Sequence, residues 1–262
     1  MTAPVQAAAK EPIVLMVDDF DLAQFSAVAA GFGQQRFGFV VTPNVDHIIR
    51  YHDDAAFREA YAAASFVLLD SRLLARLLRV TQGRRLRVCT GADLTATLFS
   101  SVIRVPDRIV LIGGSESQAQ ELSRRYGLSN IRHFNPPMGF IKDPAAVREC
   151  LEFVEAHSPF RFCFLAVGSP QQEYLAVQIQ SRARAQGLAL CIGASLNFIT
   201  GAEKRAPQWV QHLSLEWLYR LLQNPQRLAG RYLVRGPRIL GFLRGKRLVI
   251  RPRTATPGSA GA

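Results

Sequence analysis

The chain has 262 residues, of which 48% are hydrophobic and 20% are charged, and its net charge is +12. This apolar fraction is too high for a disordered chain, and the ordinary content of Gly (19 residues) and Pro (14 residues) excludes collagen-like and low-complexity sequences. The length suits one large α/β domain or two small ones.

Short apolar runs alternate with helical patterns along most of the chain. The runs with strand character are Ile13–Val17, Phe37–Val41, Phe66–Leu69, Arg85–Val88, Arg108–Ile112, Ile131–Phe134, Arg161–Val167 and Leu188–Ile192. Strands with apolar centres that are separated by helices predict a parallel sheet covered by helices on both faces. The expected fold is therefore a Rossmann-like α/β fold.

The pattern changes after about residue 195, where three helical stretches follow one another. They are expected at Pro207–Leu222, Gln226–Val234 and Arg238–Leu243, and a basic run follows them up to Arg253. We therefore divide the chain into a disordered N-terminus (1–10), an α/β body (11–200), a basic helical appendage (201–253) and a disordered tail (254–262).

The positive charge is concentrated at the C-terminal end. Residues 201–262 hold 12 basic side chains and only two acidic ones, Glu203 and Glu216, whereas residues 1–200 have a net charge of only +2. This asymmetry indicates an anionic partner, which could be a nucleic acid, an acidic lipid or a phosphorylated substrate.

The sequence leads us to expect neither a signal peptide nor a CxxC cysteine pair. The first apolar run, Ile13–Val17, ends at Asp18 and is too short for a signal peptide, and no run approaches the ~20 residues that span a bilayer. The four cysteines form no CxxC pair, and buried free thiols are expected. These features predict a cytoplasmic protein that does not cross a membrane.

Ligands of open parallel sheets bind beyond the carboxyl ends of the strands, so the polar residues that follow each strand are the candidates. Thr42 and Asn44 follow one predicted strand, where Asn44 could either cap a helix or bind a ligand. Asp70 follows the next strand; it could act as a base or cap the helix that begins at Arg72.

Two further loops carry candidate ligand-binding residues. Gly113 and Gly114 stand between a strand and a helix, an arrangement that can bind phosphate but that also occurs in ordinary tight turns. The turn Gly168–Glu173 opens another helix, and the amide of Gln172 suits a sugar hydroxyl or a base edge.

Motifs for metal binding and covalent catalysis are weak or absent. Asp19-Phe20-Asp21 has the DxD form of some metal-dependent sugar transferases, but a turn or a helix cap explains it more simply. The five histidines have no ligand spacing, and no nucleophile elbow occurs. We expect no metal and no cofactor.

The C-terminal motifs resemble the WecG/TagA/CpsF family, glycosyltransferase family 26. The resemblance is carried by Lys204-Arg205-Ala206-Pro207-Gln208-Trp209 and by Leu215-Glu216-Trp217-Leu218-Tyr219-Arg220-Leu221-Leu222, and it extends over about residues 12–235. The block Thr90-Gly91-Ala92-Asp93-Leu94 and the loops described above follow in the order typical of the family.

The resemblance implies a GT-E-type fold and an inverting, metal-independent transfer from a UDP-sugar to a polyprenyl-diphosphate-linked saccharide. It also implies work in bacterial surface or exopolysaccharide synthesis, by a peripheral protein on the anionic inner face of the plasma membrane. The implied roles are a catalytic base at Asp70, a pocket threonine at Thr42 and a donor contact at Gln172. Arg220 is expected to reach the donor diphosphate, and Arg227 and Arg231 are further phosphate candidates.

The sequence departs from the family pattern at several positions. Ser71 stands where glycine is common after the catalytic aspartate, Val88 stands where an arginine is common, and Asn197 stands where an aspartate is usual. These departures leave open a second hypothesis, a catalytically inactive UDP-sugar-binding homologue. A third, a basic nucleic-acid-binding protein, explains the charge but not the loop residues, so no nucleic acid is expected as partner.

Overall fold

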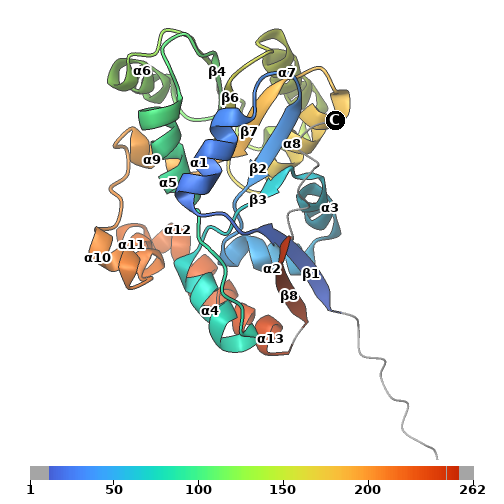
Figure 1. Ribbon diagram of the computed structural model, residues 1–262, viewed down its shortest axis with the longest axis vertical. Coiled ribbons are helices and arrows are strands. Elements are labelled where there is room, and N and C mark those ends of the chain that lie inside the picture. Colours follow the sequence, from blue (N-terminus) through green and yellow to red (C-terminus); the bar gives the residue numbers. More distant parts are fainter. Residues whose placement is uncertain (1–11, 246, 254–262) are drawn as a thin grey trace, which may run out of the picture.

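The computed structural model describes residues 12–245 and 247–253 (Figure 1). The two stretches that the sequence predicts to be disordered, 1–10 and 254–262, lie outside the described residues.

The centre of the molecule is a six-stranded, all-parallel sheet. Its strands, in spatial order, are β3 (Phe66–Val67), β2 (Phe37–Val41), β7 (Gly187–Cys191), β6 (Phe162–Leu165), β4 (Ile109–Ile112) and β5 (Ile131–Phe134). Every residue of β4, β6 and β7 is buried, as expected for a parallel sheet that is covered on both faces.

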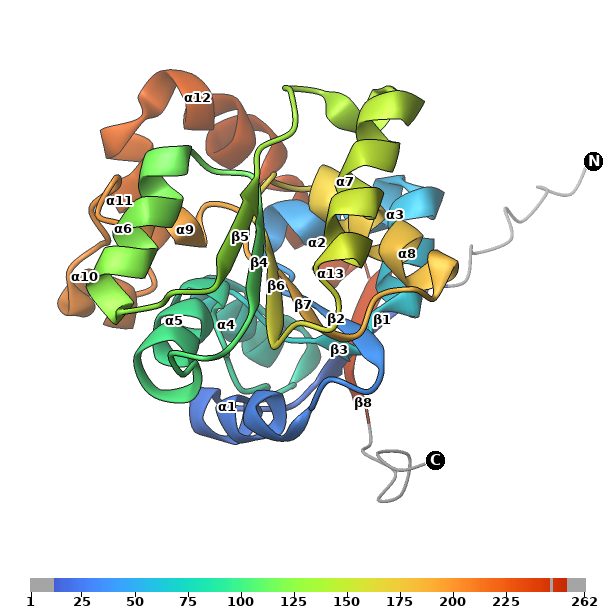
Figure 2. The ribbon, with the colours of Figure 1, turned by 90° about the horizontal axis from the view of Figure 1, so that it is seen from above.

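Helices cover both faces of this sheet (Figure 2). One face packs against α1 (Leu22–Gly31), α5 (Gly91–Thr97), α6 (Glu116–Tyr126) and α9 (Ser195–Ile199). The other face packs against α2 (Val45–Asp53), α3 (Ala55–Ala63), α7 (Pro144–Ala156) and α8 (Gln171–Arg182). The predicted Rossmann-like α/β fold is confirmed.

A second, two-stranded sheet lies beside the first one. Strand β1 (Ile13–Asp18) pairs in parallel with β8 (Leu248–Arg253), and a single bridge from Asp18 to Leu68 joins β1 to the edge of the main sheet. The sequence predicts β1 but not β8, where only a basic run was expected.

Strands form at all the predicted runs except Arg85–Val88, where the prediction of a strand is wrong. The outer edge of β3 is already occupied by the end of β1, because the Asp18 carboxylate accepts a 2.8 Å hydrogen bond from the Val67 amide. Residues 85–88 therefore have no free strand edge with which to pair. In the described residues, the segment that ends at Cys89 joins the sheet through a 3.0 Å hydrogen bond from the Cys89 amide to the Leu69 carbonyl.

The appendage begins after α9. Its elements are α10 (Gln208–His212), α11 (Glu216–Gln223), α12 (Pro225–Ala229), the π-helical turn η3 (Gly230–Arg235), α13 (Arg238–Arg244) and β8. The single helix predicted over Pro207–Leu222 is split in two, since the backbone of the buried Ser214 adopts a left-handed conformation (φ +64°) that a continuous helix cannot contain. Ile239, Phe242 and Leu243 join the main core beside α4 (Arg72–Gln82).

No helix within residues 12–245 and 247–253 combines the length and the apolar character that a membrane span requires. All four cysteines, Cys89, Cys150, Cys163 and Cys191, are buried and free, which confirms the expectation for them.

Candidate functional site

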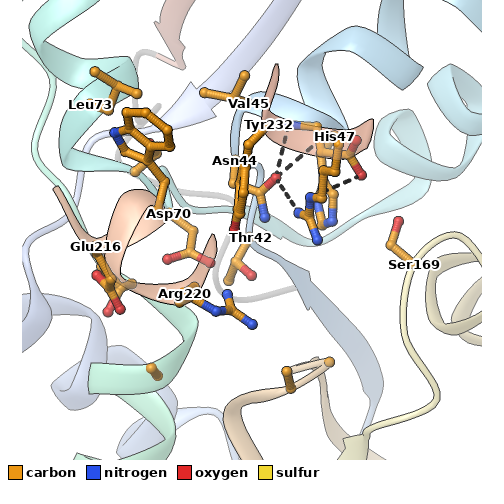
Figure 3. Close-up of a pocket in the computed structure, with 18 of the residues that line it drawn as sticks. Thr42, Asn44, Val45, His47, Asp70, Leu73, Ser169, Glu216, Arg220 and Tyr232 are labelled. Atoms are coloured by element: carbon orange, nitrogen blue, oxygen red, sulfur yellow. Dashed lines mark hydrogen bonds and ion pairs between the residues drawn. The ribbon is translucent and has the colours of Figure 1, made fainter. Parts of the chain in front are cut away.

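A pocket of about 560 Å³ opens at the carboxyl ends of the strands, between the body and the appendage (Figure 3). The body contributes the residues after β2, β3, β6 and β7, and the appendage contributes residues of α11 to α13. The pocket therefore lies where ligands of open parallel sheets bind.

Asp70 follows β3 and faces this pocket. Its amide donates to the Pro43 carbonyl at 2.9 Å, which fixes the backbone beside the end of β2. The helix-cap interpretation of Asp70 is wrong, because the hydroxyl of Ser71 caps α4 by accepting from the Leu74 amide at 3.1 Å. The Asp70 carboxyl is thus left for the pocket.

Burial is the main cause that raises the pKa of Asp70 to about 8, and the nearby carboxylate of Glu216 raises it further. The Gly91 amide, which donates a hydrogen bond to the carboxylate, and the positive charge of Arg220 act in the opposite direction. A carboxyl with this pKa is a much stronger base than an ordinary aspartate and can take a proton near neutral pH.

Asp70 and two other polar groups surround the start of α5. A Cβ atom placed on Gly91 would lie 3.2 Å from Thr42 Oγ1, 3.6 Å from Ser195 Oγ and 3.7 Å from Asp70 Oδ2. The structure thus brings the predicted pair Thr42 and Asp70 together and adds Ser195, which sequence reasoning missed. Ser195 stands a few residues after β7, so the rule that selected Asp70 would also have found it.

Arg220 lies on α11 and lines the same pocket as Asp70. Its guanidinium carbon lies 5.4 Å from the ring centre of Phe198. Within the described ranges, no carboxylate forms an ion pair with Arg220. Its charge is therefore available to an anion in the pocket.

Asn44 and Arg231 bind each other at the edge of the pocket. Asn44 Oδ1 accepts from the amides of Asp46 (3.0 Å) and His47 (3.3 Å), so the cap interpretation of Asn44 is confirmed. The same oxygen accepts from Arg231 at 3.2 Å, and Arg231 also lies 3.5 Å from the Asp46 carboxylate. Both residues line the pocket, but protein groups already occupy much of their bonding capacity.

Arg227 and Gln172 contribute in different ways. The Arg227 side chain is 62% exposed and lies 4.0 Å from Glu203, which puts it at the rim. Gln172 is buried: it accepts from the Gly193 amide at 2.9 Å and donates to the Glu173 carboxyl at 2.9 Å. The amide of Gln172 thus fixes the loop after β7 that forms the pocket wall.

Gly113 and Gly114 are not among the residues that line this pocket, so the structure does not bring them together with Asp70. Their positive φ angles of 92° and 77° and their close neighbours explain the glycines instead. A Cβ on Gly113 would lie 2.9 Å from the Ala166 backbone, and one on Gly114 would lie 2.3 Å from Leu196. Packing alone already requires glycine at both positions, so the two glycines are not by themselves evidence of a phosphate site.

The DxD motif is used locally. Asp21 caps α1 by accepting from the Gln24 amide at 2.9 Å, which confirms the helix-cap interpretation, and Asp19 accepts from the Arg87 amide at 2.7 Å. In the part of the chain that the structure describes, no three His, Cys, Asp or Glu side chains are grouped so that they could hold a metal ion.

Asn197, one of the unusual residues, lies outside the pocket wall. Its amide donates to Glu203 at 3.0 Å and accepts from Gln118 at 2.9 Å. An aspartate at this position would set a second negative charge beside Glu203, so asparagine matches its surroundings.

A cluster of four charges beside Asp70 was also missed by sequence reasoning. It contains Arg72, Asp93, Arg205 and Glu216, which we call the charge cluster. Two of its members stand in the motifs that carry the family resemblance, Arg205 in Lys204–Trp209 and Glu216 in Leu215–Leu222. Those motifs were the signal that could have identified them.

One comparison with known proteins bears on the whole chain. The family model described as "Glycosyl transferase WecG/TagA/CpsF family" matches residues 13–253. The match covers both the body and the appendage as they are described above.

Proposed function

The chain belongs to the WecG/TagA/CpsF glycosyltransferase family, and we propose that it transfers a sugar from a UDP-sugar to a polyprenyl-diphosphate-linked saccharide. Membership of the family implies a glycosyltransferase of cell-surface polysaccharide synthesis. The donor class, the acceptor class and the mechanism below are our proposals, and exopolysaccharide assembly is the pathway we favour.

The observation that carries this proposal is the presence of Asp70 and Arg220 in one pocket. In the proposed step an acceptor hydroxyl attacks the anomeric carbon of the donor sugar, and Asp70 takes the proton of that hydroxyl. The bond from the anomeric carbon to the diphosphate oxygen breaks, and UDP leaves with the electron pair. A single displacement of this kind inverts the anomeric centre.

The leaving diphosphate gathers negative charge, and Arg220 is the group we assign to it. A fixed guanidinium in a partly closed pocket stabilises developing charge more than water does. The typical gain in rate is roughly 10²- to 10³-fold. Arg227 at the rim and Arg231 beside Asp46 are secondary phosphate ligands in this proposal. We keep the metal-independent mechanism that the resemblance implies.

Thr42 and Gln172 have supporting roles in the proposal. The Thr42 hydroxyl lies on the same side of Gly91 as the Asp70 carboxyl and can orient the attacking hydroxyl. Gln172 shapes the donor pocket through its bond to the Gly193 amide.

We also propose that the appendage contacts the anionic inner face of the plasma membrane. Support comes from exposed apolar side chains that are concentrated in it: Trp209, Leu213, Leu215, Leu218, Leu222, Leu233, Val234 and Leu240. Exposed arginines such as Arg244, Arg247 and Arg251 belong to the same segment. Each basic side chain near an anionic surface contributes about 1 kcal/mol.

The experiment that tests the function is a screen of UDP-sugars against a polyprenyl-diphosphate-linked saccharide, with and without a chelator. Transfer from one UDP-sugar, unaffected by the chelator, is the expected result. UDP binding without transfer to any acceptor would favour the inactive homologue. Binding to duplex DNA with a steep salt dependence, and none to UDP, would favour the nucleic-acid hypothesis.

A further inference from the structure

The charge cluster joins the body to the appendage. Arg72 (α4) and Asp93 (α5) belong to the body, whereas Arg205 and Glu216 belong to the appendage. Each arginine lies near both carboxylates: Arg72 is 3.3 Å from Asp93 and 3.9 Å from Glu216, and Arg205 is 2.7 Å from Asp93 and 4.0 Å from Glu216. Positive and negative groups thus alternate around the cluster.

The contacts of Glu216 are longer than those of Asp93. Both arginines closely approach Asp93. The distances from Glu216 to Arg72 (3.9 Å) and to Arg205 (4.0 Å), in contrast, are too long for a hydrogen bond. In the described part of the molecule, Arg72 NH1 and the Nε and NH2 atoms of Arg205 are buried without a hydrogen-bond partner. A shift of Glu216 by about 1 Å toward the body would let it accept from these donors.

Glu216 and Arg220 lie one helical turn apart on α11, so their side chains project from the same face. Both line the pocket, and Figure 3 shows them beside Asp70. Any movement of the first turn of α11 that completes the bonds of Glu216 therefore also moves Arg220 relative to Asp70.

We propose that Glu216 is a positioning residue: by binding Arg72 and Arg205 it holds the first turn of α11 on the body, which sets the place of Arg220 and keeps a negative charge beside Asp70. This proposal rests on the proposed function, since it assigns Glu216 a role in the same transfer reaction. The charge and the position of Glu216 both act on the reaction through other residues.

The groups around Asp70 make the charge effect measurable. From α11 it faces Glu216, which raises its pKa, and Arg220, which lowers it. From α5 it faces Asp93, which raises its pKa, and the Gly91 amide, which lowers it.

Three further groups sense the charge of Asp70. Burial is the main cause that raises the pKa of the Cys89 thiol and of the Tyr61 hydroxyl, and the Asp70 carboxylate raises both further. Burial lowers the pKa of Arg205, but its hydrogen bond to Asp93 and the neighbouring carboxylates, including Asp70, raise it overall. Of the two carboxylates near Asp70, Asp93 also accepts from Thr90 at 2.7 Å, whereas Glu216 makes only the two long contacts. Substitution of Glu216 therefore removes a negative charge near Asp70 with less structural disturbance than substitution of Asp93 would cause.

The first test is a ¹³C NMR titration of the Asp70 carboxyl in protein labelled at the aspartate γ-carbon, with the resonance assigned from Asp70→Asn. In Glu216→Gln we expect the Asp70 midpoint to fall by about one pH unit, because a nearby negative charge is lost. Glu216→Asp keeps the charge and should titrate near the wild type. An unshifted midpoint in a folded Glu216→Gln protein overturns the proposal.

Glu155→Gln is the matched control for this titration. Glu155 is also held by two arginines, at 2.6 Å from Arg182 and 3.8 Å from Arg184, but it lies on α7 away from the pocket. The Asp70 midpoint should not change in this variant. An equal shift in Glu155→Gln would mean that loss of any such ion pair disturbs Asp70, which also overturns the proposal.

The second test measures UDP affinity in Glu216→Gln, in Arg72→Met and in the double variant. We expect each single variant to weaken UDP binding by roughly tenfold and the double variant to be little worse than either, because the residues act as a unit. Additive losses, or unchanged affinity, would overturn the positioning of Arg220.

The titration needs no substrate, so its result is independent of the transfer reaction. If the wild type shows no transfer while Glu216→Gln shifts the midpoint, the proposed function fails and the link from Glu216 to Asp70 stands. If the wild type transfers sugar and Asp70→Asn does not, but Glu216→Gln matches the wild type in midpoint and UDP affinity, the function stands and this inference fails.

Discussion

Asp70 and Arg220, which come from opposite halves of the chain, line one pocket and interact electrostatically: the guanidinium lowers the pKa of a carboxyl that burial raises to about 8. Substitution of Asp70 by asparagine keeps its shape but removes its basicity. We expect Asp70→Asn to reduce the transfer rate by about 10²- to 10⁴-fold while UDP binding and folding remain. The measurements are kcat, calorimetric UDP affinity and Tm; a variant with wild-type kcat would exclude Asp70 as the base.

The activity should depend on pH through Asp70. The base must be ionised to accept a proton, so the transfer rate should rise with pH and level off above about 8. Initial transfer rates measured from about pH 5.5 to about pH 9.5 test this pH dependence. A rate that is already maximal at about pH 5.5 would mean that an ordinary carboxyl, or none, limits the reaction.

The stability of the fold should change with pH for the same reason. Because the folded-state pKa of Asp70 is raised, the stability from this group is fully present below the unfolded value of about 4 and is lost as the pH rises toward about 8. Urea unfolding should therefore show that Asp70→Asn gains stability relative to the wild type between about pH 5 and pH 8. A constant difference between the two proteins contradicts this expectation.

Arg220 should matter for donor binding and for the chemical step, but little for folding, since it has no ion pair with the body in the described residues. We expect Arg220→Ala to lower kcat/KM by about 10²- to 10³-fold with a nearly unchanged Tm. Arg220→Lys should recover only part of this loss because lysine lacks the planar fork. Arg124→Ala, an exposed arginine on α6, serves as the control and should behave as the wild type.

Gly91 offers a test in which stability and activity separate. In Gly91→Ala the new methyl group would lie 3.2 Å from Thr42 Oγ1 and 3.7 Å from Asp70 Oδ2, within the space around the base. We expect kcat to fall on the order of tenfold, whereas Tm should not fall, because alanine favours the helix that begins there. Loss of activity together with a large loss of stability would indicate a general packing defect instead.

The proposed membrane contact can be tested with single side chains. Leu222 is 74% exposed on α11, and Val105 is 55% exposed just before β4, at the amino end of the main sheet. Leu222→Glu should weaken cosedimentation with phosphatidylglycerol vesicles several-fold, whereas Val105→Glu should not. Equal binding of both variants would argue against the appendage as the membrane-facing surface.

Local rules predicted the parts of the site that lie directly after strands. Thr42 and Asp70 follow buried strands, and a parallel sheet brings such ends together whatever the details of the loops. The same rule is not decisive for Gly113 and Gly114, because two glycines after a strand look alike whether a ligand or the side chain of Leu196 approaches their backbone.

Features that depend on distant partners could not be predicted. Strand β8 contains arginines and a proline and forms because β1, at the other end of the chain, offers it an edge. The charge cluster joins residues from α4, α5 and the appendage, and no local pattern shows that Arg72 and Arg205 meet the same carboxylate. Only the family motifs pointed to Arg205 and Glu216.

The pairing of β1 with β8 ties the appendage to the body at both of its ends. A segment attached only after α9 could swing away from the pocket as a rigid arm, but here Leu248 and Ile250 lie in the core beside Leu15 and Val17. The appendage is therefore attached to the body on both sides of α11 and α12, which contribute residues to the pocket between these two attachments. We therefore expect ligand exchange to involve local displacements of this segment rather than a rigid swing of the whole appendage.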